Sequence, residues 1–228
     1  MLAFSLESPF LSKSTGCNLV QIATRVMLGQ SLAQQGITGS AERKEQRWYV
    51  KAPAFSFAKL TGMDAYLSPE MKSTGEAIGY DDKLPRAMYK ALQASGMNVQ
   101  NYGTVFVTLA DEDKPEGLPL VRRFYEMGFN IEATAGTAAY LKSFGIRTRV
   151  RGKISDGSHE ILDSIRSGYV SYIINTRSIH SSVHAQDGAA IRRCAVENGV
   201  TVFTSLDTVR VLLDVLEETT LGISTIDA

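Results

Sequence analysis

The chain has 228 residues, enough for one or two domains with a substantial buried core. Its 24 Lys and Arg balance 24 Asp and Glu, which excludes a protein that binds polyanions over its whole surface and leaves room for a local basic pocket. A hydrophobic fraction of 44% and a charged fraction of 21% exclude disorder along the whole chain.

Several protein classes are also disfavoured by what the sequence lacks. Two cysteines far apart, Cys17 and Cys194, form neither a disulfide framework nor a closed zinc site. The start, MLAFSLESPFLSKSTG, has no basic segment followed by a long apolar one, and no run approaches the roughly 18 apolar residues of a membrane span. We therefore expect a cytoplasmic protein with no membrane or nucleic-acid partner. GxGxxG, Walker A and HExxH strings do not occur.

The first part of the chain, residues 1–97, has an irregular α+β pattern. Helical spacing predicts a helix over 18–35, and a second helix is predicted over 84–95. Residues 41–47 are charged and indicate a solvated linker. The stretch 48–60 alternates like a strand but contains Pro53, and 66–80 is rich in Gly and polar residues, which predicts a loop.

From residue 98 onward, apolar strands alternate regularly with helices of about three turns. Strands are predicted over 104–110, 129–134, 146–151, 169–176 and 200–203. Helices are predicted over 118–127, after the turn at 134–137 through residue 144, and over 160–167, 187–198 and 206–219. This alternation is typical of βαβ units, so we predict an α/β fold with a mainly parallel sheet flanked by helices, in a domain spanning 98–228.

Polar residues gather where the predicted strands end, which is where open parallel sheets bind ligands. The candidate site residues are Thr108, Lys114, Thr134, Gly136, Thr137, Lys153, Asn175, Thr176 and Arg177. Hydroxyls, an amide, cations and a helix N-terminus meeting at one edge are the groups that bind a phosphate monoester. The alternative for each residue is structural: threonines cap helices, lysines lie solvated at the surface, and Asn175 closes a loop.

Other candidate residues carry weaker patterns. His180 and His184 have the i,i+4 spacing of metal ligands, but no carboxylate or cysteine stands nearby in a useful pattern, and His159 is isolated. No nucleophile elbow supports a Ser–His–Asp arrangement. Arg192 and Arg193 are either anion ligands or ion-pair and surface residues.

The sequence resembles the C-terminal part of carbamoyl phosphate synthase large chains. PFLSKSTG (9–16), RVMLGQSL (25–32) and SPEMKSTGE (68–76) are similar to the end of the second synthetase half. EATAGTAAYL, GKISDG, YIINT and AAIRRCA are similar to the regulatory domain that follows it. The resemblance implies an ATP-grasp tail over 1–97 and a methylglyoxal-synthase-like allosteric domain over 98–228.

That resemblance also implies a role and partners. The family is an ATP-dependent ligase that supplies carbamoyl phosphate for pyrimidine and arginine synthesis, working with further synthetase domains and a glutaminase small subunit. The segment MLAFSLES does not match the family's metal- and ATP-binding residues. We therefore expect no ATP, Mg or Mn site in this chain and no ligase activity from it alone.

The family's effector site implies a nucleotide monophosphate ligand such as UMP or IMP. Thr108 stands where the family has a phosphate-contacting Ser, and the other matching positions are Lys114, Thr134, Thr137, Lys153 and Asn175. Arg177 replaces a Thr of that site, which favours a more highly phosphorylated effector such as PRPP.

Some members also bind ornithine. Asp187 and Thr204 match that site, but Ala52 stands in place of a required Glu, so we expect no ornithine site here.

Two alternatives remain open. One is a methylglyoxal synthase acting on dihydroxyacetone phosphate, which needs a carboxylate base. Ser158 stands where that family has its catalytic Asp, with Asp156 two residues earlier, so we expect no such activity. The other is a remnant fragment without function.

Overall fold

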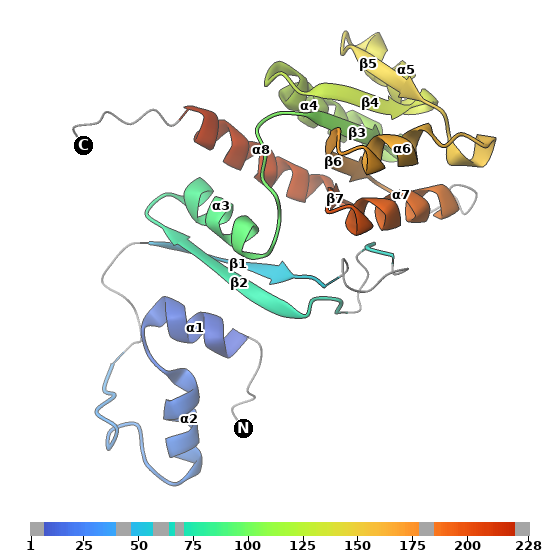
Figure 1. Cartoon of the computed structure of the whole chain (residues 1–228). Coiled ribbons are helices and arrows are strands. Elements are labelled where there is room, and N and C mark those ends of the chain that lie inside the picture. Colours follow the sequence, from blue (N-terminus) through green and yellow to red (C-terminus); the bar gives the residue numbers. More distant parts are fainter. Residues whose placement is uncertain (1–6, 40–46, 57–63, 67–70, 178–184, 222–228) are drawn as a thin grey trace.

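The computed structural model describes residues 7–39, 47–56, 64–66, 71–177 and 185–221. Its main feature is a five-stranded parallel sheet in the order β5-β4-β3-β6-β7 (Figure 1). The strands are β3 (Thr104–Thr108), β4 (Asn130–Thr134), β5 (Thr148–Arg151), β6 (Val170–Asn175) and β7 (Thr201–Phe203). The predicted α/β fold with a parallel sheet flanked by helices is confirmed.

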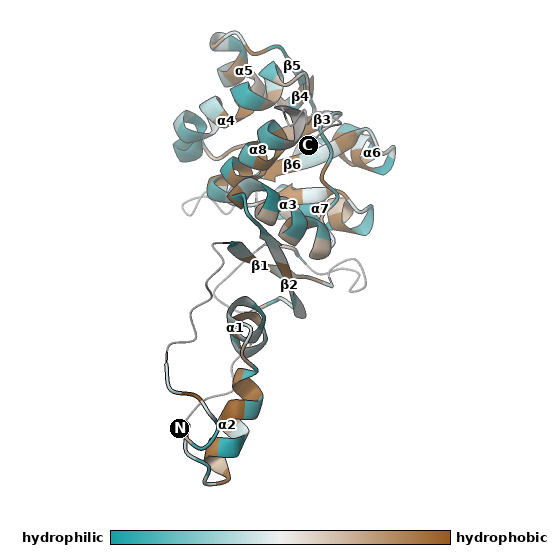
Figure 2. Ribbon diagram, turned by 90° about the vertical axis from the view of Figure 1, so that its left-hand side faces the viewer, coloured by the Kyte–Doolittle hydropathy of each residue, from teal (hydrophilic) through white to brown (hydrophobic). Residues whose placement is uncertain are grey.

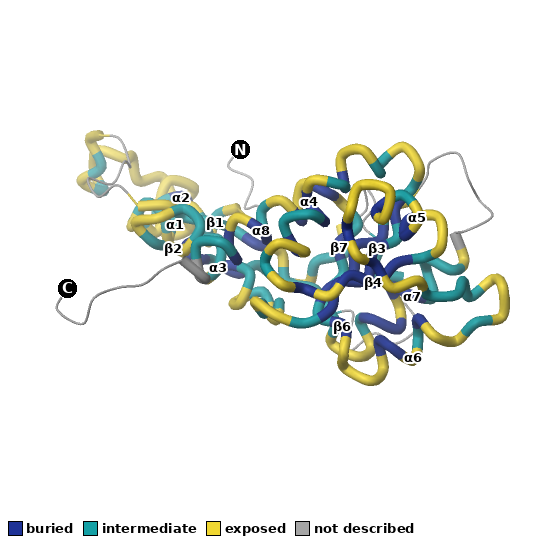
Figure 3. The backbone as a smooth tube through the Cα atoms, turned by 90° about the horizontal axis from the view of Figure 1, so that it is seen from above, coloured by how far each residue is buried: buried dark blue, intermediate teal, exposed yellow. Residues whose placement is uncertain are grey.

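Helices cover both faces of this sheet. They are α4 (Lys114–Glu126), α5 (Ala135–Ser143), α6 (Glu160–Arg166), α7 (Ala185–Glu197) and α8 (Leu206–Leu221). Side chains alternate across a strand, so Val105 and Val107 of β3 join the core beneath α4, α5 and α8, whereas Phe106 faces α6 and α7. Figure 3 shows the buried positions concentrated in this part of the chain.

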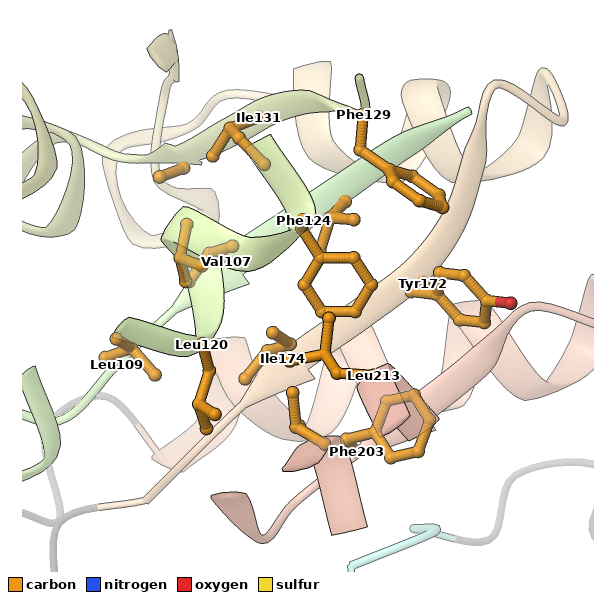
Figure 4. Close-up of a cluster of buried hydrophobic side chains, with 14 of the residues drawn as sticks. Val107, Leu109, Leu120, Phe124, Phe129, Ile131, Tyr172, Ile174, Phe203 and Leu213 are labelled. Carbon is orange, nitrogen blue, oxygen red and sulfur yellow. The ribbon is translucent and has the colours of Figure 1, made fainter. Parts of the chain in front are cut away.

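The larger core is built around aromatic side chains from three elements. Phe124 of α4 contacts Phe129 edge-on, with ring centroids 5.2 Å apart, and lies 5.9 Å from the ring of Tyr172 (Figure 4). Phe203 of β7 and Leu213 of α8 close the same cluster. Burying this much apolar surface supplies the main driving force for folding of the domain and makes its sheet a rigid support.

The described residues before β3 contain three further helices and an antiparallel pair of strands. They are α1 (Glu7–Thr15), α2 (Leu19–Met27), the antiparallel strands β1 (Trp48–Ala54) and β2 (Gly75–Asp81), and α3 (Leu84–Ala94). Figure 2 shows α1 and α2 extending away from the other elements. In contrast, α3 packs against α8. Contacts therefore cross residue 97, and the predicted division there stays a prediction.

Three expectations for the helices and strands were wrong. The helix predicted over 18–35 ends at Met27, because the chain turns at Leu28 and Gly29 adopts a left-handed φ of 93°. The loop predicted over 66–80 contains β2 from Gly75 onward. Sequence composition missed this strand because its buried residues, Ala77 and Gly79, are small. A Cβ at Gly79 would lie 2.1 Å from the Ala87 carbonyl oxygen, so the close approach of α3 requires glycine.

The helix predicted over 118–127 begins earlier, at Lys114. Pro115 occupies its first turn, where the missing N–H has no helical partner to lose. The strand pattern of 48–60 is observed in part, as β1 over Trp48–Ala54, while 57–60 lie outside the described residues. Among the described residues β1 pairs with β2 alone, and such an edge strand accommodates Pro53. The linker residues 41–46 and part of the 68–76 motif lie outside the described residues.

Candidate functional site

A cavity of about 450 Å³ lies at the carboxyl ends of the parallel strands. Loops after β3, β4, β5 and β6 and the first turns of α7 form its walls. All nine residues predicted from the strand ends line it: Thr108, Lys114, Thr134, Gly136, Thr137, Lys153, Asn175, Thr176 and Arg177. The structure thus brings the predicted set together in one place, and its binding role stays a prediction.

The N-terminus of α5 opens into this cavity. Thr134 precedes the helix in an extended conformation, and its side chain makes no capping hydrogen bond. The first N–H groups of a helix have no intrahelical acceptor, and the helix dipole makes this end positive. Gly136 leaves the first turn without a Cβ, so a ligand can approach the backbone closely. The α5 N-terminus is therefore suited to an anion.

Two of the threonine hydroxyls hold the loop after β3. The Leu109 N–H donates to Oγ1 of Thr137 (3.2 Å), and the Ala110 N–H donates to Oγ1 of Thr176 (2.9 Å). Each hydroxyl accepts one bond in this way and keeps its own proton to donate. Thr137 and Thr176 therefore shape the cavity wall, which is a different structural role from the capping of a helix.

Two lysines supply positive charge to the cavity. The Lys114 ammonium forms an ion pair with Asp111 (2.5 Å) and lies 5.9 Å from the centre of the Tyr140 ring. The hydrogen bond from Lys114 is the main cause that lowers the pKa of the Asp111 carboxyl, and the charge of Lys153 adds to it. The Asp111 side chain is 91% exposed, whereas that of Lys114 is 16% exposed. Lys114 is thus largely covered, and its counter-ion Asp111 stands in solvent.

Arg192 of α7 lines the cavity and forms an ion pair, one of the roles that the sequence left open for it. It is 2% exposed, and its guanidinium makes two bonds to the Asp64 carboxylate, Nε to Oδ1 and Nη2 to Oδ2, both 2.6 Å. These bonds are the main cause that lowers the pKa of Asp64. The sequence does contain a signal for the burial of Arg192, because the small residues Gly188 and Ala195, four positions before it and three after it, share its helical face. The neighbouring Arg193 is exposed.

The two residues weighed as a methylglyoxal synthase base do not line the cavity. Asp156 lies in a short 3₁₀ turn, and the Ser158 hydroxyl accepts a hydrogen bond from the Glu160 N–H (3.3 Å). Of the residues matched to an ornithine site, Asp187 lines the cavity and accepts a bond from the Ser155 N–H (3.0 Å), whereas Thr204 does not line it. Ala52 is buried in β1.

The described residues contain no group of three or more His, Cys, Asp or Glu placed to hold a metal ion. His180 and His184 lie outside these residues. Across the same ranges, no helix has both the length and the apolarity needed to cross a bilayer.

The C-terminal part of the chain is similar to a known domain family. Residues 116–204 match the family model of the MGS-like domain. This MGS-like segment runs from α4 to just past β7 and contains Thr134, Lys153 and the cavity residues of α5 and β6. The match agrees with the observed α/β architecture. It fits a regulatory domain or a methylglyoxal-synthase-type fold.

Proposed function

We propose that this chain is an allosteric, phosphorylated-metabolite-binding portion of a carbamoyl phosphate synthase large chain. Its effector is a nucleotide monophosphate such as UMP or IMP, or PRPP. Its partners are the remaining synthetase domains and the glutaminase small subunit, and its compartment is the cytoplasm. The MGS-like match supports the domain type, and the resemblance of residues 9–76 to a synthetase half supports the enzyme.

One observation carries the proposal: all nine residues expected to bind a phosphate line one cavity. The ammonium of Lys114 and the open N-terminus of α5 lie at the same place, because a Cβ at Gly136 would be 3.9 Å from Lys114 Nζ. A phosphate there would receive backbone N–H groups from the helix and a charged hydrogen bond from the lysine. Lys153 and Arg177 offer further charge for a ligand with more than one phosphate.

Methylglyoxal synthase activity, the alternative function for this fold, has less support from the cavity. Removal of a proton beside a carbonyl needs a carboxylate within hydrogen-bond reach of the substrate. Ser158 and Asp156 lie outside the cavity lining. Three carboxylates line it: Asp111, which is bound by Lys114, Asp187, which accepts from the Ser155 N–H, and Glu112. The cavity is therefore better suited to binding a phosphate than to proton abstraction.

Thermal unfolding tests the proposal. A ligand that binds only the folded state raises the unfolding midpoint, and at a hundred times its Kd it adds about 2.7 kcal/mol to the free energy of unfolding. We expect millimolar UMP, IMP or PRPP to raise the midpoint more than the same concentration of inorganic phosphate does. No shift with any of the three would contradict the proposal. Formation of methylglyoxal from dihydroxyacetone phosphate would favour the enzyme instead.

A further inference from the structure

A short segment from the N-terminal part of the chain reaches the wall of the cavity. Residues 64–66 lie beside α7 in Figure 1, and Asp64 is 128 positions from its ion-pair partner Arg192. Two contacts fix the segment locally. The Tyr66 N–H donates to Oδ1 of Asp64 (3.0 Å), and the Lys72 ammonium donates to the Tyr66 carbonyl oxygen (2.5 Å).

The same segment contacts both arginines of the cavity. The Tyr66 ring centre lies 5.3 Å from the Arg192 guanidinium and 5.5 Å from that of Arg177, within the range of cation–π attraction. Arg192 is buried and Arg177 is exposed, yet each lines the cavity. Asp64 therefore holds Arg192 through an ion pair, and the Tyr66 ring lies against the guanidinium groups of both Arg192 and Arg177.

Arg192 in turn determines which end of the Asn175 amide faces it. Its Nη1 donates to Oδ1 of Asn175 at 2.5 Å. A guanidinium has only donors, so only the oxygen of the Asn175 amide can bond to it. The NH₂ group of the amide must therefore point away from Arg192. Asn175 is 3% exposed and lines the cavity, where an NH₂ group attracts a phosphate and a carbonyl oxygen repels it.

Close packing keeps this pair in place. A Cβ on Gly188, in the first turns of α7, would lie 3.0 Å from Arg192 Nη1 and 3.3 Å from Oδ1 of Asn175. The helix backbone thus lies directly against the Arg192–Asn175 hydrogen bond. The bonds to Asp64 and Asn175 engage all three nitrogens of the Arg192 guanidinium.

We infer that Asp64 is a positioning residue for the phosphate site, acting through Arg192 to orient the Asn175 amide toward a bound anion. The inference rests on the proposed function of the cavity. According to this inference, the affinity of the cavity for a phosphate depends on whether residues 64–66 are in contact with Arg192. By linkage, a bound phosphate must stabilise that docking by the same factor.

A double-mutant cycle in UMP binding tests this. We expect Asp64→Asn to weaken UMP binding by about tenfold, the loss typical of one charged hydrogen bond. In an Asn175→Ala background the same substitution should have no further effect, because its route through the amide is gone. Asp163→Asn, which breaks the exposed ion pair with Arg166 on α6, is the matched control and should bind as the wild type does. Unchanged binding by Asp64→Asn, or an equal loss in both backgrounds, would overturn the inference.

Two further measurements keep the inference falsifiable. If Asp64→Asn fails to fold, Tyr66→Leu tests the docking of the same segment, because Tyr66 contacts Arg192 and does not line the cavity. It should also weaken UMP binding; wild-type affinity would count against the inference. In the ligand-free protein, Asp64→Asn should shift the side-chain amide resonances of Asn175, and unshifted resonances would overturn it. If the wild type binds none of UMP, IMP and PRPP, the proposed function is wrong. The amide resonances of Asn175 then still decide whether Asp64 positions its side chain.

Discussion

The backbone N–H of Leu109 donates a hydrogen bond to the hydroxyl of Thr137, 3.2 Å away and 28 positions later in the chain. This bond joins the end of β3 to the first turn of α5. Both residues are buried, with exposures of 8% and 2%. The loop that carries Ala110 and Asp111 in the cavity lining therefore depends on a side chain of the neighbouring helix α5.

Thr137→Val should destabilise the protein. Valine has nearly the same shape but no acceptor, so the buried Leu109 N–H loses its partner, at a cost of about 1–3 kcal/mol in the free energy of unfolding. Thr137→Ser keeps the acceptor and removes one methyl group, and it should cost less. Urea unfolding of the two variants measures the difference. A Thr137→Ser variant that is no more stable than Thr137→Val would show that the hydroxyl contributes nothing.

Gly136→Ala should separate stability from binding. Its backbone is not in the left-handed region, and an added Cβ would approach Lys114 Nζ no closer than 3.9 Å, so the free protein tolerates alanine. Alanine favours helix over glycine by up to about 1 kcal/mol, and the unfolding midpoint should not fall. The methyl group would occupy space where a phosphate approaches the helix N–H groups, so UMP affinity should drop. A variant that binds UMP as tightly as the wild type would place the phosphate elsewhere.

Tyr172 should make stability fall in alkaline solution. Its buried phenol donates to the Gln100 carbonyl oxygen (2.7 Å), and burial raises its pKa from 10.0 to about 12. The unfolded chain therefore releases this proton at a lower pH than the folded one. The contribution of this pKa difference to the free energy of unfolding is fully present below pH 10 and is lost as the pH rises toward 12. At its largest it is about 2–3 kcal/mol.

Tyr172→Phe gives the comparison, because it removes this titration and both hydrogen bonds between the Tyr172 hydroxyl and the Gln100 backbone. The wild type should be the more stable protein at neutral pH, and its advantage should shrink between pH 10 and 12. Urea unfolding midpoints of the two proteins across that range measure the effect. An advantage that stays constant with pH would mean that Tyr172 ionises as readily in the folded protein as in the unfolded one.

Much of the C-terminal fold is predictable from local sequence, and the reason is visible in the core. Strands such as β3 and β6 are nearly continuous apolar runs, as expected for strands buried on both faces, and the helices between them have clear ends. The carboxyl ends of such strands must share one edge, so the amino-acid sequence alone is enough to group Thr108, Thr134 and Asn175.

What the sequence left undetermined depends on contacts between distant segments. β2 has a small-residue strand pattern that becomes recognisable only with α3 packed on Gly79. Nothing local to Asp64 indicates that its carboxylate lies against Arg192, 128 positions later. Arg192 itself was recognisable as a helix residue on the buried face, but its partner was not.

Calorimetric titration of UMP into the wild type, Lys153→Ala and Lys142→Ala tests the central claim most directly. Lys153 lines the cavity, whereas Lys142 is an exposed lysine of α5 that does not. Loss of one charged hydrogen bond should weaken binding to Lys153→Ala by about ten- to a hundredfold, while Lys142→Ala binds as the wild type does. Equal affinities for all three proteins, or no binding to the wild type by UMP, IMP or PRPP, would contradict a phosphate site at the carboxyl edge of this sheet.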